Sequence, residues 1–425
     1  MKNISKTTAN ISQQIIIYGL GILILLMPFH AFFSIYLGSL GFDRVIVQSW
    51  KEVLALILSF AWLAYQLSKK KLAFKADAVN IFFISIVFVS ILVTLFIRPN
   101  SEAVLFGVKT NLVAIAIFFI AQIPIPSKSF LKKNLLWIIL VPGLIVSLLA
   151  VIQSFLIPPS LLEQIGYNIN TINPRQIIDG SIDFFRSFST LGGPNQLGAY
   201  LLLPLAFSLA YGIKRRSWPI LCSSILILAG ITLSFSRSAW IGAIITFGLA
   251  VFISLEIKQK IIFALFSIVL LLSAVVGIGT QINTNVRLQN VLLHGRVFEN
   301  RIEGSDSARL ESISNTTKEI IKRPFGHGLG SAGPASFKSA KPIIPENWFL
   351  QISYEIGIVG LLLYILAFAA LLGDFIRDRK NPLAVSLFSA TIGILVINIF
   401  LQGLGDSTLV LITFALYGLY KSRNQ

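Results

Sequence analysis

Long apolar runs cover most of the chain, and short polar stretches separate them. Such runs predict membrane-spanning helices, because about 20 helical residues are needed to cross the hydrocarbon core of a bilayer. We interpret twelve runs in this way: 14–37, 47–67, 78–97, 103–122, 134–157, 195–212, 217–233, 238–256, 261–280, 347–373, 382–401 and 405–420. The pattern predicts an all-α, polytopic membrane protein with about twelve transmembrane helices.

The composition supports this interpretation, since 55% of the residues are apolar and only 12% are charged. The first run begins near Ile15 and is longer than the apolar core of a signal peptide, so we expect an uncleaved first span. No internal repeat, low-complexity segment or soluble domain boundary interrupts the runs. We therefore expect one integral membrane domain over residues 1–425.

Basic residues gather on alternate connections. If the twelve runs alternate across the membrane, nineteen lysines and arginines on short loops and tails fall on one side, which is the pattern of cytoplasmic loops. We expect both termini to be cytoplasmic and the protein to lie in the cytoplasmic (inner) membrane. The net charge of +17 then reflects topology, and we expect no nucleic acid partner. The nineteen residues are Lys2, Lys6, Lys69, Lys70, Lys71, Lys75, Lys128, Lys132, Lys133, Lys214, Arg215, Arg216, Lys258, Lys260, Arg377, Arg379, Lys380, Lys421 and Arg423.

One long polar segment, residues 281–346, lies on the opposite, extracytoplasmic side. It holds nine Lys/Arg, six Asp/Glu and two of the three histidines. Ser305 or Asp306 can cap a helix whose apolar positions recur from Leu310 to Ile320, and Pro324 would end it. A loop of this length in a compact protein is usually functional or disordered. We predict a helical extracytoplasmic cap over an active site.

A second group of cations lies on the outer side. Arg186 precedes the run 195–212, Arg237 lies in the turn before 238–256, and Arg309 lies on the predicted cap helix. If they converge, their guanidinium groups would suit a pyrophosphate, which they bind in bidentate fashion. Lys109 lies inside the run 103–122, where an ionisable group suggests function unless it reaches the interface.

Other polar features allow more than one interpretation. Lys51 stands beside Glu52, and the two can form a plain surface ion pair. The glycines of PFGHGLGS, around His327, predict a turn. Its backbone amides either bind an anion or have only a structural role. Neither His294 nor His327 has a partner at metal-ligand spacing, and we expect no metal ion and no cofactor.

The chain resembles the O-antigen ligase and polymerase family of bacterial envelope enzymes. Four stretches between about Arg186 and Tyr364 carry the resemblance: FRSFSTLGGPNQLGAYL, LSFSRSAWIG, SDSARLES…RPFGHGLGS and PENWFLQISYEIGIVGLLLY. The resemblance implies an inverting glycosyltransferase that moves a glycan from undecaprenyl pyrophosphate to a glycan or cell-surface acceptor outside the cytoplasmic membrane. Its partners would be these substrates and membrane lipid.

The resemblance also suggests site residues. The family's outer arginines map onto Arg186, Arg237 and Arg309, and we assign Arg186, Lys109, Asn195, Asn347 and His327 to substrate binding. Many ligases of this family carry a His-Asn pair where this chain has Glu346 and Asn347. We expect catalysis to use Glu346, Arg309 and Arg237, with Glu346 as the general base.

Several alternatives stay open at this point. Glu346 can instead stabilise the start of the following helix, and His327 is the other possible base. The residues do not decide between ligase and polymerase. A lipid-linked glycan flippase or other transporter is the alternative function, although transporters often show internal repeats and polar groups at the membrane midplane.

Overall fold

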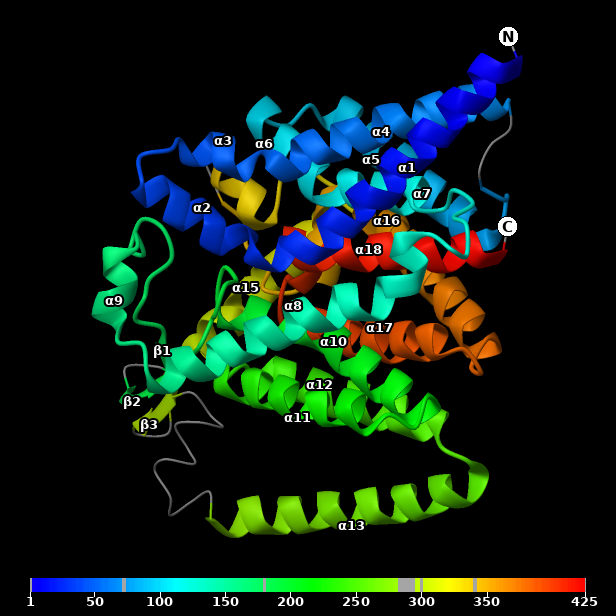
Figure 1. Cartoon of the computed structure of the whole chain (residues 1–425). Coiled ribbons are helices and arrows are strands. Elements are labelled where there is room, and N and C mark those ends of the chain that lie inside the picture. Colours follow the sequence, from blue (N-terminus) through cyan, green and yellow to red (C-terminus); the bar gives the residue numbers. More distant parts are fainter. Residues whose placement is uncertain are drawn as a thin grey trace.

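The computed structural model describes residues 2–70, 74–178, 181–281, 295–298, 301–338 and 342–424. Each of the twelve predicted runs falls on a helix (Figure 1). The helices are α1 (Lys2–Leu26), α2 (His30–Ser39), α3 (Arg44–Gln48), α4 (Trp50–Lys69), α5 (Ala78–Ile97), α6 (Ser101–Gly107), the π-helix η2 (Val108–Leu112), α7 (Val113–Ile120), α8 (Phe130–Phe155), α9 (Pro159–Gln164), α10 (Pro194–Lys214), α11 (Trp218–Leu233), α12 (Arg237–Ser254), α13 (Ile257–Gln281), α15 (Ser305–Lys322), α16 (Trp348–Arg377), α17 (Pro382–Phe400) and α18 (Ser407–Lys421).

Two short antiparallel hairpins complete the described structure. Strand β1 (Ile177–Ile178) pairs with β2 (Ser181–Phe185), and β3 (Gly295–Phe298) pairs with β4 (Arg301–Gly304). Both hairpins lie at the same end of the bundle as α9 (Figure 1). The hairpins were not predicted, because the sequence around them lacks a run of alternating apolar residues long enough to indicate a strand.

Among the described residues, eight helical segments are long and apolar enough to cross a membrane. They are Lys6–Ser39, Ala78–Ile97, Ser101–Ile120, Phe130–Phe155, Pro194–Lys214, Arg237–Ser254, Trp348–Arg377 and Pro382–Phe400, with shorter apolar helices at Trp218–Leu233 and Ser407–Lys421. The chain is a polytopic, all-helical membrane protein in agreement with the sequence. The count of twelve crossings and their orientation stay predictions.

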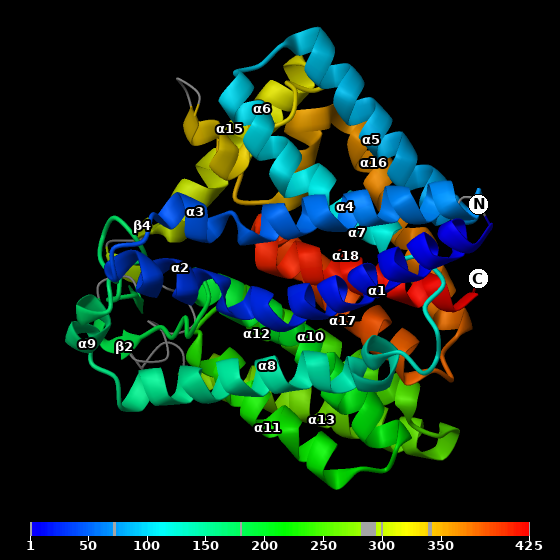
Figure 2. The same ribbon diagram turned by 45° about the horizontal axis from the view of Figure 1, so that its top comes forward.

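Helix α10 lies at the centre of the bundle and packs against α8, α11, α12 and α17 (Figures 1 and 2). Seventeen of its 21 residues are buried, which explains why its sequence is apolar on every face. Helices α12 and α17 approach closely because Gly393 faces the backbone carbonyl of Gly242, where a side chain would not fit. This packing fixes the beginning of α12 against the bundle.

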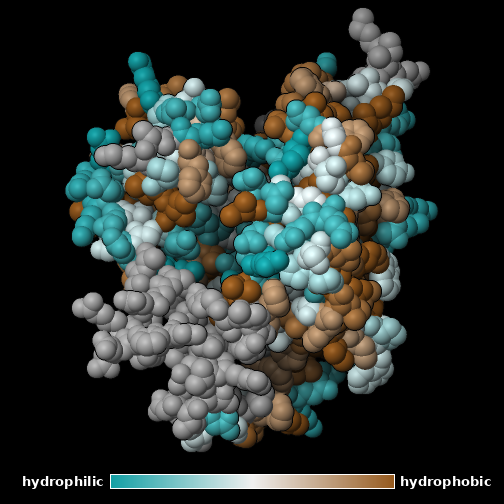
Figure 3. Space-filling model, turned by 90° about the vertical axis from the view of Figure 1, so that its left-hand side faces the viewer, coloured by the Kyte–Doolittle hydropathy of each residue, from teal (hydrophilic) through white to brown (hydrophobic). Residues whose placement is uncertain are grey.

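The two ends of the bundle differ in character. Both termini lie at one end, and the hairpins and α9 lie at the other, where α15 also begins (Figures 1 and 2). At that second end, hydrophilic residues gather beside a hollow near the centre of the surface, with hydrophobic patches between them (Figure 3). Helix α15 spans Ser305–Lys322, so the predicted cap helix is confirmed as a helix.

Helix α16 is broken at Gly357, whose φ of 75° and ψ of 177° are not helical. The glycine-rich turn fills the break: the amides of His327 and Gly328 donate to the carbonyls of Tyr354 and Glu355 at 2.8 Å. The amide of Ile358 donates to the carbonyl of Pro324 at 2.9 Å. These two turn amides are therefore occupied by protein carbonyls, and the turn connects α15 to α16.

Candidate active site

Three arginines that are distant in the sequence lie around one cavity of about 610 Å³. Arg186 follows β2, Arg237 is the first residue of α12, and Arg309 lies in the second turn of α15. Asn195 and Asn347 line the same cavity. Five of the eight residues predicted to form the site are therefore brought together.

Arg186 is held in place by two side-chain hydrogen bonds. Its Nε donates to the carbonyl of Ser234 at 3.2 Å, and its Nη2 donates to Oδ1 of Asn195 at 2.8 Å. The backbone is also tied to this region, since the amide of Ser187 donates to the carbonyl of Leu233 at 2.9 Å. These bonds orient the guanidinium group before any ligand arrives.

Arg237 adds a second source of positive potential. It begins α12, and the exposed amides at a helix N-terminus carry a partial positive charge. Apolar residues complete the wall of the cavity, among them Ile241, Ile313 and Phe400. The cavity therefore combines cations with a hydrophobic surface, as an amphiphilic anion requires.

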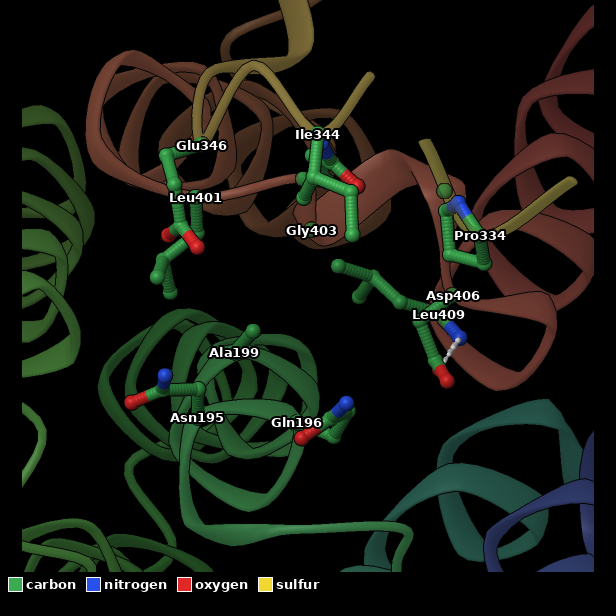
Figure 4. Close-up of a pocket in the computed structure, with 12 residues that line it drawn as sticks. Asn195, Gln196, Ala199, Pro334, Ile344, Glu346, Leu401, Gly403, Asp406 and Leu409 are labelled. Carbon is green, nitrogen blue, oxygen red and sulfur yellow. Dashed lines mark hydrogen bonds between the residues drawn. The ribbon is translucent and has the colours of Figure 1, made fainter. Parts of the chain in front are cut away.

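Glu346 lies beside Arg309, with 3.6 Å between its Oε2 and Nη2 of the arginine. Its backbone is in the left-handed region, with φ of 52°. It lines a second cavity of about 250 Å³ that shares Asn195 and Leu401 with the larger one. Figure 4 shows its carboxylate pointing into this smaller cavity toward α10.

Asn347 caps α16, because its Oδ1 accepts from the amide of Leu350 at 3.0 Å. Its Nδ2 donates to the carbonyl of Ile399 at 2.8 Å. The capping role that the sequence left open for Glu346 is therefore carried by the side chain of Asn347. This leaves the Glu346 carboxylate directed at the cavities.

Lys109 and His327 are not among the residues that line either cavity. Lys109 lies on η2 and pairs with Glu52, at 2.6 Å between Nζ and Oε1. His327 stacks on Tyr354, with ring centroids 3.9 Å apart. Burial lowers the pKa of His327.

The interpretation of Lys51 and Glu52 as a plain surface ion pair is wrong. Lys51 is only 6% exposed, and its Nζ lies 2.7 Å from Nε2 of His30 and 3.0 Å from Oγ of Ser407. Sequence adjacency misled the prediction, because consecutive helical residues point in different directions. Glu52 instead faces Lys109.

Four polar residues near the site were not predicted from the sequence. Gln196, Gln402 and Asp406 line the smaller cavity, and Glu355 is fully buried on α16. Gln402 and Asp406 were detectable as polar residues in a short connection between two apolar helices. Glu355 was detectable as a carboxylate inside a predicted span, which is costly and suggests function.

No group of three or more His, Cys, Asp or Glu residues that could hold a metal ion occurs within the described part of the chain. His294 lies outside the described residues. The side chains at the cavities offer guanidinium groups, the carboxylates of Glu346 and Asp406, and several amides.

Comparison with known proteins identifies the same region. Residues 222–365 match the family described as O-antigen ligase, a family of membrane enzymes in polysaccharide biosynthesis. An O-antigen polymerase of Salmonella muenchen is 24% identical over 289 residues, which cover 64% of this chain and 68% of that protein. The matched segment contains Arg237, Arg309 and Glu346. Residues 222–365 are therefore similar to the O-antigen ligase family, and the chain is distantly similar to an O-antigen polymerase.

Proposed function

We propose that this protein transfers a glycan from undecaprenyl pyrophosphate to an acceptor hydroxyl at the outer face of the cytoplasmic membrane. The observation that carries the proposal is the convergence of Arg186, Arg237 and Arg309 on one cavity of about 610 Å³. The elements that supply its residues, among them β1 and the beginning of α15, lie at the end of the bundle opposite both termini (Figure 1). The basic loops predict that the termini are cytoplasmic.

The donor's pyrophosphate accounts for the three cations. Arginine binds phosphate oxygens through two parallel N–H groups, so a cluster of three guanidinium groups suits a diphosphate. The apolar wall at Ile241, Ile313 and Phe400 suits the first isoprene units of the lipid. A single cavity can therefore hold both the charged and the apolar part of the carrier.

The reaction is a displacement at the anomeric carbon of the donor sugar. Glu346 takes the proton of the acceptor hydroxyl, and the acceptor oxygen forms a bond to the anomeric carbon from the face opposite the leaving group. The bond from that carbon to the phosphate oxygen breaks, and its electron pair leaves with undecaprenyl pyrophosphate. A single displacement inverts the configuration.

Charged side chains support both the departure of the pyrophosphate and the deprotonation of the acceptor hydroxyl. Negative charge grows on the leaving pyrophosphate, and fixed cations aimed at it lower the barrier. Removal of a positioned general base usually costs about 10²–10⁴-fold in rate. Two observations support Glu346 in that role: it lines one cavity, and it pairs with Arg309 of the other.

The test compares Arg237→Ala and Arg237→Lys with Arg377→Ala. Arg377 is a matched control, since its side chain is 81% exposed and lies on α16 away from the cavities. The loss of one fixed donor to a developing anion costs about 10²–10³-fold, so Arg237→Ala should lose most transfer of glycan from its purified lipid-linked donor. Arg237→Lys should lose part of it, because lysine keeps the charge and lacks the bidentate fork.

The same variants distinguish the enzyme from the alternative, a lipid-linked glycan flippase. A flippase would move the lipid-linked donor across the membrane without consuming it. Unchanged transfer in Arg237→Ala together with failed translocation of the donor would show that the protein is a transporter. Lost transfer with unchanged translocation supports the enzyme.

A further inference from the structure

The smaller cavity, with a volume of about 250 Å³, has polar side chains among apolar ones in its lining and carries no arginine or lysine among the described residues that line it. We infer that it is the acceptor subsite and that it binds the sugar ring whose hydroxyl attacks the donor. This inference rests on the proposed glycan transfer and adds to it a binding site for the second substrate.

The charges of the two cavities separate two kinds of ligand. The larger cavity is lined by three arginines, whereas the smaller one is lined by the carboxylates of Glu346 and Asp406. A pyrophosphate would find no guanidinium partner in the smaller cavity, whose titratable side chains are carboxylates. A sugar ring, which presents uncharged hydroxyls, needs no such cation.

The side chains in this cavity match the hydrogen-bonding capacity of sugar hydroxyls. A hydroxyl both donates and accepts, and amide and carboxylate side chains offer donors and acceptors to it. Asn195 and Gln196 reach the cavity from α10, and Glu346 faces them from the other side (Figure 4). Gln402 completes this set.

Gln402 supplies an independent indication of a ligand. Its Nε2 is buried and has no hydrogen-bond partner among the described protein atoms. A buried amide donor is normally paired, so an unpaired one at a cavity wall points to an acceptor oxygen brought by a ligand. The cavity volume equals roughly eight water molecules at about 30 Å³ each, which is the scale of one sugar ring.

The position of the cavity suits the reaction. Asn195 lines both cavities and accepts a hydrogen bond from Arg186 at 2.8 Å. Glu346 lines the smaller cavity and lies 3.6 Å from Arg309 of the larger one. A hydroxyl held here would therefore meet the base on one side and the donor's anomeric carbon on the other.

The experiment separates the two substrates with glutamine variants. Gln196→Ala and Gln402→Ala each remove one cavity amide, and Gln164→Ala is the matched control, since Gln164 is exposed on α9. The full-length protein in detergent is supplied with its purified lipid-linked donor. The acceptor probe is the glycan released from that donor by mild acid.

We expect each cavity variant to raise KM for the acceptor probe by roughly 2- to 12-fold, as the loss of one neutral hydrogen bond does. KM for the donor should stay unchanged, and Gln164→Ala should resemble the wild type. Thermal unfolding of each variant shows whether it has folded, and the two variants are independent, so misfolding of one leaves the other as the test.

Two results would overturn the inference: an unchanged acceptor KM in a folded cavity variant, or a raised donor KM with the acceptor KM unchanged. Binding of undecaprenyl pyrophosphate is measured separately. If the wild type and Arg237→Ala bind this lipid equally, the proposed function fails. If the wild type binds it better and the cavity variants keep their acceptor KM, only the acceptor subsite fails.

Discussion

Replacing Glu346 by glycine, asparagine or alanine separates the role of its carboxylate in catalysis from the effect of its backbone conformation on stability. The residue has φ of 52°, a conformation that glycine adopts freely and asparagine tolerates, and that alanine and glutamate resist. All three variants remove the carboxylate. If Glu346 is the general base, all three should lose transfer by about 10²–10⁴-fold, whatever their stability.

The stabilities should differ in a defined order. A left-handed residue other than glycine costs roughly 1–2 kcal/mol, and glycine loses about 0.5–1 kcal/mol more entropy on folding. The ion pair with Arg309 contributes about 0.2–1 kcal/mol, because the two side chains are 26% and 41% exposed. The free energy of unfolding of Glu346→Gly should therefore lie within about 1 kcal/mol of the wild-type value. Glu346→Ala should be less stable than Glu346→Gly.

Two measurements on the same purified samples decide the outcome: thermal unfolding in detergent, and transfer from the lipid-linked donor. Glycine or asparagine variants that retain near-wild-type transfer would refute the base and leave Glu346 a backbone role. An alanine variant as stable as the glycine variant would refute the assigned backbone strain. The two conclusions are independent.

Three further predictions concern the parts that hold the site together. Gly330→Ala should abolish folding, seen as loss of a single species in gel filtration, because φ is 78° and a Cβ would overlap the carbonyl of Ala103; Gly373→Ala, which meets nothing within 4 Å, should fold and is the control. Burial lowers the pKa of His327, so its contribution to stability is present above the unfolded-state pKa of about 6.5 and is lost as the pH falls through the lower folded-state pKa. His327→Gln should flatten that part of a thermal-unfolding pH profile, and identical profiles would contradict the assignment. Glu355→Leu should cost about 1–3 kcal/mol in the free energy of unfolding, since it removes the buried acceptor of Nδ2 of Asn111 at 3.1 Å and of the backbone amides of Gly330 and Ala332. Glu355→Gln keeps an acceptor oxygen and should cost less.

The helices were predictable because each depends on its own apolar run. A stretch of about 20 apolar residues must satisfy its backbone hydrogen bonds internally in a membrane, so helical structure follows without knowledge of the neighbours. The cap helix was predictable for a similar local reason, since its cap, its apolar spacing and its ending proline lie within 20 residues. For these elements the local sequence is sufficient to predict the helix.

The convergence of the arginines depended on packing, which no local pattern records. Arg186 is oriented by the carbonyl of Ser234, 48 residues away in the chain, and the smaller cavity joins α10 to residues near 346 and 402. The sequence showed that Arg186, Arg237 and Arg309 needed partners. It offered Glu52 as one possible partner of Lys51 and did not show His30, because that contact depends on how α2 and α4 pack.

The site combines groups from two structural sources. Arg186 is held by the end of α11 and the beginning of α10, and Arg237 is the first residue of α12, whereas Arg309 and Glu346 both belong to the segment 281–346, called the cap segment. Within that segment the hydroxyl of Ser312 on α15 donates to the carbonyl of Ile344, two residues before Glu346. This bond connects α15, which carries Arg309, to the loop segment that carries the carboxylate of Glu346. The ion pair at 3.6 Å is thus set inside the cap, and docking α15 against α16 brings both groups to the bundle's arginines together.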